Sequence, residues 1–316
     1  MNSVDEPADL VPADAPFGRT RFSAPFDLSA PEAASCGLVF SSPHSGSFYP
    51  PSFRAQTRLD DLTLRRSEDA DADALFGCAE ELGAPMLRAR YPRAFLDLNR
   101  EPYELDPRMF AEPLPDFANT RSLRVAAGLG TIPRVVADAR EIYAQKLTVA
   151  EALARIEEVY KPYHEALERL MAQAAARFGV AVLIDCHSMP KLVTHDPKLG
   201  PKTEKRRVDF VIGDRFGASC DARLVEIVAS RLTGFGYVVQ RNRPYAGGFI
   251  TEHYGRPAAS RHAMQIEASR DLYLDEATLA PNAHFSAVAA HIGAALAELA
   301  QELPRLDSAP SRLAAE

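Results

Sequence analysis

Two histidines stand where an apolar, strand-like run of the sequence gives way to polar residues. Residues 179–190 contain the run Val-Ala-Val-Leu-Ile, which predicts a buried strand, and then turn polar at Asp185 and His187. Residues 37–41 predict a second strand, and the turn-forming residues that follow it include His44. Ligands bind beyond the carboxyl ends of strands in open α/β sheets, so both histidines are candidates for one active-site rim.

Two histidines and a carboxylate form the ligand set of a catalytic zinc site. Such a site keeps a fourth position for water and lowers the pKa of that water towards about 7. Glu68 and Asp69 are the nearest acidic candidates, at the opening of a predicted helix that runs to about residue 82. Each acid has an alternative role as a helix cap, and His187 has one as a hydrogen-bonded core histidine.

Amide hydrolysis at such a site also requires a general base and a cation or donor for the tetrahedral oxyanion. Glu267, near the end of a predicted strand, and Arg100 have suitable chemistry. An ordinary salt bridge to Arg270 is the alternative role for Glu267. Glu252 competes for the role of base, but it lies in a glycine-rich loop beside His253, whereas a strand is a more rigid mount.

Covalent mechanisms have less support in this sequence. Alternation along the strand turns Cys186 to the face opposite Asp185 and His187, and Ser45-Gly46 lacks the Gly-x-Ser-x-Gly elbow. The four cysteines are scattered without a Cys-x-x-Cys pair, which favours reduced thiols. The residues alone therefore favour a metallohydrolase over other α/β enzymes or a non-catalytic binding protein.

Strands and helices that alternate along the chain predict an α/β fold with a mixed, mostly parallel central sheet and helices on both faces. Pro162 predicts a break near Tyr160 in the helical run 148–178, and Gly179 predicts its end. We expect an N-terminal arm, one catalytic domain and a C-terminal tail, over residues 1–33, 34–302 and 303–316.

The remaining expected elements are strands at 208–212, 236–240 and 263–268, two strand-like pieces within 86–98, helices at 221–233 and 281–302, and loops at 104–134, 191–207 and 242–255.

Composition narrows the class of protein. The chain has 316 residues, of which 47% are apolar and 25% charged, as in ordinary globular proteins. Its net charge of -7 argues against nucleic acid as a partner, although an anionic small molecule responds to local arginines. The acidic, proline-containing start does not resemble a signal peptide, and no apolar run is long enough to span a membrane. We expect a cytoplasmic protein, whose oligomeric state the sequence does not determine.

Eight short motifs occur in a specific order between about residues 37 and 275, and together they resemble the N-formylglutamate amidohydrolase family. They are Pro-His-Ser-Gly (43–46), Ser-Glu-Asp (67–69), Asp-Leu-Asn-Arg (97–100), Pro-Tyr-His (162–164), Asp-Cys-His-Ser-Met-Pro (185–190), Asn-Arg-Pro-Tyr (242–245), Thr-Glu-His-Tyr-Gly (251–255) and Gln-Ile-Glu (265–267).

The resemblance implies a fold similar to that of zinc carboxypeptidases and the cleavage of N-formyl-L-glutamate to formate and L-glutamate in histidine degradation. It implies that His44 and His187 bind the metal, expected to be Zn²⁺, with Asp69 or Glu68 as third ligand. Ser at position 47 departs from the His-x-x-Glu pattern of zinc carboxypeptidases, which leaves the third ligand open between these two acids; Asp69 is our choice.

The resemblance also implies a role for Glu267 as general base and for the Asn99-Arg100 pair in binding a substrate carboxylate. Arg243 and Arg256 are further candidates for holding this small anionic N-acyl amino acid, because a guanidinium pairs bidentately with a carboxylate. A deacylase for another N-acyl amino acid or small peptide is the rival enzyme, and a metal- or amino-acid-binding protein is the non-catalytic rival.

Overall fold

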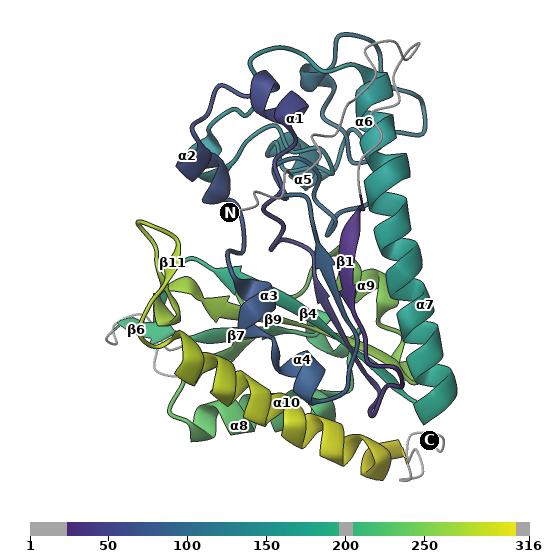
Figure 1. Cartoon of the computed structure of the whole chain (residues 1–316), viewed down its shortest axis with the longest axis vertical. Helices are drawn as coiled ribbons and strands as arrows, with labels where there is room; N and C mark the ends of the chain where they lie inside the picture. The colour runs from purple at the N-terminus through teal and green to yellow at the C-terminus, as the bar shows by residue number, and fades with distance from the viewer. Residues whose placement is uncertain (1–23, 196–204, 308–316) are drawn as a thin grey trace, which may run out of the picture.

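A seven-stranded sheet forms the centre of the computed structural model, which describes residues 24–195 and 205–307 (Figure 1). The order of its strands is β1-β3-β2-β4-β9-β7-β8. The four central strands are parallel, as is the pair β7–β8, whereas β1 and β7 run antiparallel to their neighbours β3 and β9. The predicted α/β fold with a mixed, mostly parallel sheet is therefore confirmed. The strands are β1 (Phe26–Ser29), β2 (Leu38–Ser42), β3 (Met86–Ala89), β4 (Ala181–Met189), β7 (Phe210–Gly213), β8 (Val239–Arg241) and β9 (Arg261–Ser269).

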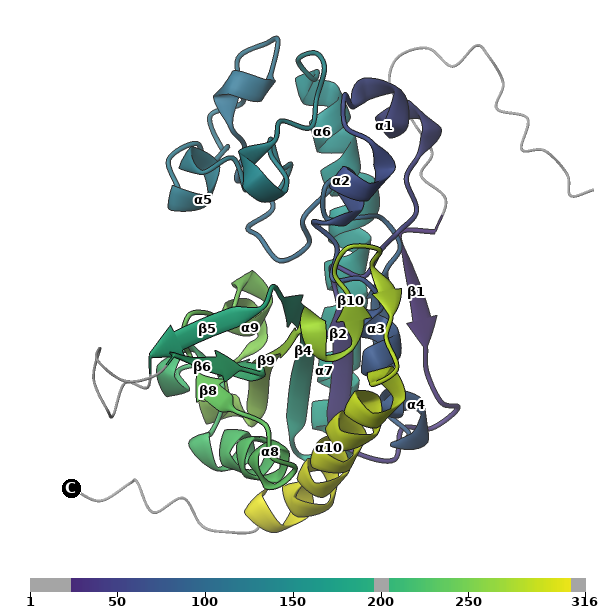
Figure 2. The same cartoon turned by 90° about the vertical axis from the view of Figure 1, so that its left-hand side faces the viewer.

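Helices cover both faces of the sheet. One face packs against α7 and α9, and the other packs against α3, α4, α8 and α10 (Figure 2). The helices are α1 (Pro51–Gln56), α2 (Asp61–Arg65), α3 (Ala72–Leu75), α4 (Cys78–Glu81), α5 (Leu123–Ala126), α6 (Val149–Arg155), α7 (Lys161–Phe178), α8 (Ala222–Gly234), α9 (Phe249–Tyr254) and α10 (Phe285–Asp307). Among the described helices, none is both long enough and apolar enough to cross a bilayer.

The central strand β4 is buried along its whole length, which explains its continuous apolar sequence. Its side chains alternate between two cores: Leu183 packs with α7, whereas Ile184 and Cys186 pack with α8 and α10. Asp185 and His187 fall on the α7 side, so Cys186 faces away from them, as alternation predicts.

The chain leaves β2 and β3 at their carboxyl ends and builds a cap, which we define as residues 47–66 and 92–155. The cap contains α1, α2, α5 and α6 and lies beyond one end of the sheet (Figures 1 and 2). Much of it is irregular but buried, with Phe53 and Phe95 in contact at its centre. The candidate active site lies where the cap meets the carboxyl ends of the strands.

The helical run before β4 has the predicted break. A π-helical turn at Ile156–Tyr160 joins α6 to α7 just before Pro162, whose missing N–H removes a hydrogen-bond donor from the helix. Gly179 then ends α7 in the left-handed conformation, with φ of 75°, which glycine adopts without steric cost.

Several elements begin or end elsewhere than the sequence predicts. The expected arm over residues 1–33 includes the edge strand β1, and its residues 1–23 lie outside the described part. The expected tail begins inside α10, which continues to Asp307 and buries Leu303. The second strand-like piece of 86–98 is irregular, because its apolar residues pack into the cap rather than pair with a strand.

Three other segments differ from the expected elements. The helix expected up to residue 82 is split into α3 and α4, with Asp71 in the left-handed conformation before α3. The expected glycine-rich loop contains α9. The expected polar loop 191–207 contains an antiparallel pair of strands, β5 (Leu192–His195) and β6 (Lys205–Val208). A second two-stranded pair consists of β10 (Leu274–Asp275) and β11 (Ala280–Pro281).

Candidate active site

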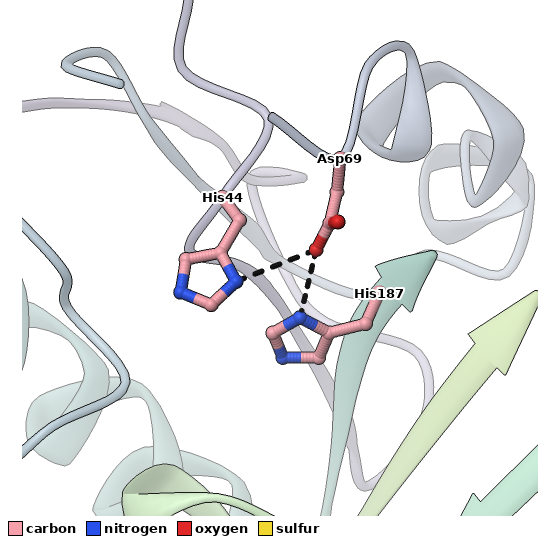
Figure 3. Close-up of side chains that lie close together, drawn as sticks. All are labelled: His44, Asp69 and His187. Carbon is pink, nitrogen blue, oxygen red and sulfur yellow. Dashed lines mark hydrogen bonds and ion pairs between the residues drawn. The ribbon is translucent and has the colours of Figure 1, made fainter. Parts of the chain in front are cut away.

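Three side chains from separate segments converge at the carboxyl end of the sheet. His44 follows β2, Asp69 lies between α2 and α3, and His187 stands near the end of β4 (Figure 3). Asp69 Oδ2 lies 3.4 Å from His44 Nδ1 and 3.0 Å from His187 Nδ1. All three residues are buried, and their ligand atoms lie within 4.8 Å of one another.

Two further carboxylates hold the opposite nitrogens of the imidazole rings. Asp97 Oδ1 lies 2.8 Å from His44 Nε2, and Asp185 Oδ2 lies 3.0 Å from His187 Nε2. Asn99 Nδ2 donates to the same oxygen of Asp185 over 3.2 Å. Carboxylates in this position orient histidine ligands in metal sites and raise their basicity.

The cluster fits a divalent metal. His44 Nδ1 is buried and, within the described residues, has no hydrogen-bond partner, although it faces the oxygen of Asp69 and the ring of His187. A buried polar atom without a partner is costly unless something else satisfies it. Two imidazoles and one carboxylate are ligands that suit zinc, and a fourth position would remain for water or substrate.

Neighbouring charges and hydrogen bonds shift the pKa values of Asp69 and His187 away from their usual ranges. Burial raises the pKa of Asp69, but the hydrogen bond with His187 and the nearby imidazole of His44 outweigh this and leave it well below its usual range. Burial lowers the pKa of His187, but the negative charge of Asp185 outweighs it and leaves that pKa well above the usual value. In the metal-free protein, a proton on His187 therefore balances part of the buried negative charge.

Arg270 fixes the carboxylate of Asp69 from behind. Its Nη2 donates to Asp69 Oδ1 over 3.1 Å and to the carbonyl of Glu68, and its Nε donates to Ser188 Oγ. Ser188 Oγ also donates to Asp69 Oδ1 over 3.1 Å. The Oδ2 atom of Asp69 is thereby turned towards the two histidines.

Glu68, the other candidate for third ligand, points elsewhere. The hydroxyl of Tyr49 donates to its Oε1, and Arg65 Nε donates to its Oε2 over 3.2 Å. Both oxygens are thus engaged away from the histidines. Of the two adjacent acids, the structure brings Asp69 and not Glu68 to the cluster.

Glu267 lies beside His187 because the two residues are register partners on the parallel strands β9 and β4. Its side chain is buried, and its Oε1 accepts a hydrogen bond of 2.6 Å from Gln265 Nε2. Burial raises the pKa of Glu267 to about 7, aided by Asp69 and opposed by the charge of His187. The alternative ion pair with Arg270 does not form: Arg270 pairs with Asp69 instead.

A cavity of about 670 Å³ opens onto the cluster between the cap and the sheet. Its lining includes the three cluster residues, Glu267, Asn99 and five arginines. Neither Arg243 nor Arg256 belongs to that lining. The cavity arginines are Arg66, Arg93, Arg100, Arg124 and Arg270.

The Asn99-Arg100 pair is held firmly at the cavity wall. Asn99 Oδ1 accepts from the backbone N–H of Ile250 over 2.8 Å, and a Cβ at Gly248 would lie 2.4 Å from the same oxygen, so only glycine fits there. Arg100 donates to the carbonyls of Leu129 and Asn99 and pairs with Asp97. Much of the donor capacity of Arg100 is therefore used within the protein.

Glu252, the competing candidate for the base, lies away from the cluster. It is exposed, pairs with Arg215 over 2.7 Å, and lines a second pocket together with Arg256. Glu267 lines the main cavity instead. Of the two acids, only Glu267 shares a cavity with the His–Asp–His cluster.

Sequence reasoning missed several contributors to the site. Asp97 was visible as the first residue of the motif Asp-Leu-Asn-Arg, and Gln265 as the first of Gln-Ile-Glu, so their spacing from Asn99 and Glu267 could have indicated them. Arg93 and Arg124 had no such signal, because their position depends on how the irregular cap folds.

The fold and site together define an α/β protein with a buried His–Asp–His cluster of metal-binding type at the carboxyl edge of its sheet. A model of the N-formylglutamate amidohydrolase family matches residues 36–274. The chain belongs to this family, and this membership makes it an amidohydrolase.

Individual relatives agree with the family assignment. The chain is 32% identical to the N-formylglutamate deformylase of Pseudomonas aeruginosa, with 84% of this chain and 92% of the relative covered. It is 30% identical to the enzyme of that name from Pseudomonas putida, over 76% of this chain and 82% of the relative.

A solved structure also resembles the chain closely. The crystal structure of N-formylglutamate amidohydrolase from Ralstonia eutropha JMP134 has a TM-score of 0.81 and 36% identity, and covers 90% of this chain and 99% of that one. A solved structure of a protein from Agrobacterium tumefaciens shares the fold, with a TM-score of 0.61 and 20% identity. It covers 87% of this chain and 95% of that one.

Proposed function

We propose that the protein is a metal-dependent amidohydrolase that cleaves N-formyl-L-glutamate to formate and L-glutamate, a step of histidine degradation. The observation that carries the proposal is the convergence of His44, Asp69 and His187 on one buried point beside Glu267. The family membership and the names of the relatives support the formyl group and the glutamate. We also propose a cytoplasmic location, with which the free cysteines agree.

His44, Asp69 and His187 would hold a divalent metal, for which zinc is our first choice. When bound, such a metal polarises a carbonyl and lowers the pKa of a water molecule. Asp97 and Asp185 keep the two imidazoles oriented for this role. Because Asp69 already has a low pKa, its carboxylate stays charged at neutral pH and is ready to bind a cation.

Glu267 supplies the proton transfers of the hydrolysis. Its carboxylate takes a proton from the attacking water, the oxygen of which forms the new bond to the formyl carbon. The carbon–nitrogen bond then breaks, and the same proton passes to the departing nitrogen of glutamate. A pKa near neutrality suits a group that must both accept and return a proton.

Arginines of the cavity provide the positive charge that the reaction and an anionic substrate require. Arg93 lines the cavity and uses its Nη2 to bind Asp97 over 2.9 Å, and Arg100 binds the same carboxylate. Through Asp97, both cations lie close to His44. They can stabilise negative charge that develops on the formyl oxygen.

A turnover screen tests the proposal. The zinc-loaded protein should hydrolyse N-formyl-L-glutamate in preference to N-acetyl- and N-succinyl-L-glutamate, as followed by release of L-glutamate. Faster turnover of the acetyl or succinyl compound would make the protein a different deacylase. Binding of all three without turnover would make it a non-catalytic binding protein.

A further inference from the structure

Arg124 is a cavity arginine that has no partner among the residues that the structure describes. It lies on α5 of the cap, is half-buried, and faces the main cavity, which also contains the His–Asp–His cluster. No carboxylate of the described chain lies within ion-pair distance of its guanidinium. A half-buried cation without a counter-charge is a natural place for an anionic group of a ligand.

Three other cavity arginines are already bound to protein groups. Arg93 and Arg100 share the carboxylate of Asp97, and Arg270 binds Asp69 and two backbone carbonyls. The fifth, Arg66, is exposed, so water solvates its charge. Arg124 therefore differs from the rest in being both enclosed and unpaired.

The cap side of the cavity carries an excess of positive charge. Burial is the main cause that lowers the pKa of Arg100 to about 10. The nearby positive charges of Arg93 and Arg124 contribute to this shift. Asp97 offsets part of this charge, but it also accepts a hydrogen bond from His44. An added carboxylate beside Arg124 would relieve the remaining repulsion.

Helix α5, which carries Arg124, lies in the cap, apart from the strands β2 and β4 whose ends carry the two histidines (Figure 2). Arg124 also lines a neighbouring pocket of about 420 Å³ whose wall contains Glu101 and Phe249 but none of the cluster residues. The backbone of Arg124 is fixed there: Ser122 Oγ accepts from the N–H of Val125 at the start of α5 over 3.1 Å.

We infer that Arg124 is a specificity-determining residue that binds the side-chain carboxylate of the N-acyl amino acid. The inference rests on the proposed function. Hydrolysis requires the amide to lie at the cluster. The α-carboxylate is attached to the same carbon as the amide nitrogen, so it stays near the cluster, within reach of Arg93 and Arg100. The side-chain carboxylate of glutamate is two carbons further along the chain, so it extends away from the cluster and can reach Arg124 on the cap side of the cavity.

The test compares two substrates that differ only in the charge of the side chain. N-formyl-L-glutamate and N-formyl-L-glutamine are hydrolysed by the wild type and by Arg124→Gln and Arg124→Lys. A charge-assisted bidentate contact predicts that Arg124→Gln lowers kcat/KM for formylglutamate about 10- to 100-fold, mainly through KM, and changes formylglutamine less than about 3-fold. Arg124→Lys keeps the positive charge but cannot make the bidentate contact, so its kcat/KM for formylglutamate should lie between those of the wild type and Arg124→Gln.

Arg121→Gln is the matched control, because Arg121 belongs to the same cap segment, is exposed, and lines none of the pockets described above. It should keep the wild-type preference between the two substrates. Binding of L-glutamate, measured by calorimetry, provides a readout without turnover, and Arg124→Gln should weaken it while binding of L-glutamine stays unchanged.

The outcomes separate the two proposals. Equal losses on both substrates in Arg124→Gln, or no loss on either, would overturn the assignment of Arg124 while leaving the amidohydrolase in place. A zinc-loaded wild type that turns over neither formyl compound would overturn the proposed function, and the role of Arg124 with it. Thermal unfolding of each variant checks that altered kinetics do not reflect a loss of fold.

Discussion

At the scale of single residues, Glu267 combines burial with a position beside His187. Burial destabilises its charged form, so the carboxyl titrates near neutrality instead of near its ordinary value of about 4.3. A cation bound at the cluster would stabilise the charged carboxylate and lower this pKa. In the metal-loaded enzyme, a general base at this position should therefore become protonated, and inactive, only at a pH below about 7.

Replacing Glu267 by Gln tests this role. Glu267→Gln should lower kcat by a factor of about 10² or more, because the amide cannot accept the proton of the water. The acidic limb of the kcat/KM profile, expected below about pH 7 in the wild type, should disappear with it. Metal content, measured by mass spectrometry, should not change. If Glu252→Gln is the inactive variant instead, the base lies on the segment around α9.

Asp69 and Glu68 are adjacent acids with opposite surroundings. Asp69→Asn should lose most of its zinc on dialysis, because a neutral amide replaces the charged ligand between the two histidines. Glu68→Gln is the matched control and should retain zinc, since Tyr49 and Arg65 hold that side chain elsewhere. Retention of zinc by Asp69→Asn together with its loss from Glu68→Gln would reverse the assignment of the third ligand.

At the scale of elements, the strands that carry the cluster were predictable and the cap was not. β2 and β4 are buried parallel strands, so their apolar runs and the polar residues after them are visible in the sequence. The short edge strand β1 has no comparable signal: it exists because β3 offers an unpaired edge. The cap has few periodic segments, and tertiary packing determines its structure.

A buried arginine holds the cap together. Arg155, at the end of α6, is fully buried, and its Nη1 donates to the carbonyl of Phe95 over 3.0 Å and to the hydroxyl of Tyr143 over 2.8 Å. Its guanidinium also lies 4.1 Å from the ring centroid of Phe95 and pairs with Glu151. The helix is thereby joined to two irregular segments of the cap.

Arg155→Leu should destabilise the protein by about 2–4 kcal/mol, because buried acceptors lose their donor and Glu151 loses its counter-charge. Arg169→Leu, at an exposed position of α7, is the control and should change stability by less than about 0.5 kcal/mol. Urea unfolding followed by circular dichroism measures both. An unfolding midpoint for Arg155→Leu equal to that of the control would show that the buried arginine contributes nothing to the cap.

At the scale of the whole molecule, the sequence indicates the chemistry better than the specificity. His44 and His187 are recognisable because strand ends fix where they lie, and Asn99 and Glu267 because they belong to ordered motifs. Arg243 and Arg256 looked equivalent to the cavity arginines, since every arginine offers the same charge. Which arginines line the cavity depends on long-range packing between the cap and the sheet, which local patterns do not encode.

The same long-range assembly predicts that metal binding stabilises the fold. The three candidate ligands come from separate segments that meet only in the folded protein, so zinc bound at the cluster would stabilise the native state, by about 4 kcal/mol at a free concentration 1,000 times Kd. Zinc must displace the proton of His187, whose pKa is well above its usual value, so the gain should grow as pH rises.

The difference in Tm between zinc-loaded and chelator-treated protein should therefore be larger at about pH 8 than at about pH 6, because protons compete with zinc for the imidazoles. Differential scanning calorimetry at both pH values measures it, and comparing the two forms at one pH cancels every titration that they share. The double variant His44→Ala/His187→Ala should show no zinc-dependent shift at either pH. A shift of wild-type size in that variant would mean that zinc stabilises the fold from another site, and a larger wild-type shift at the lower pH would remove His187 as the group that competes with the proton.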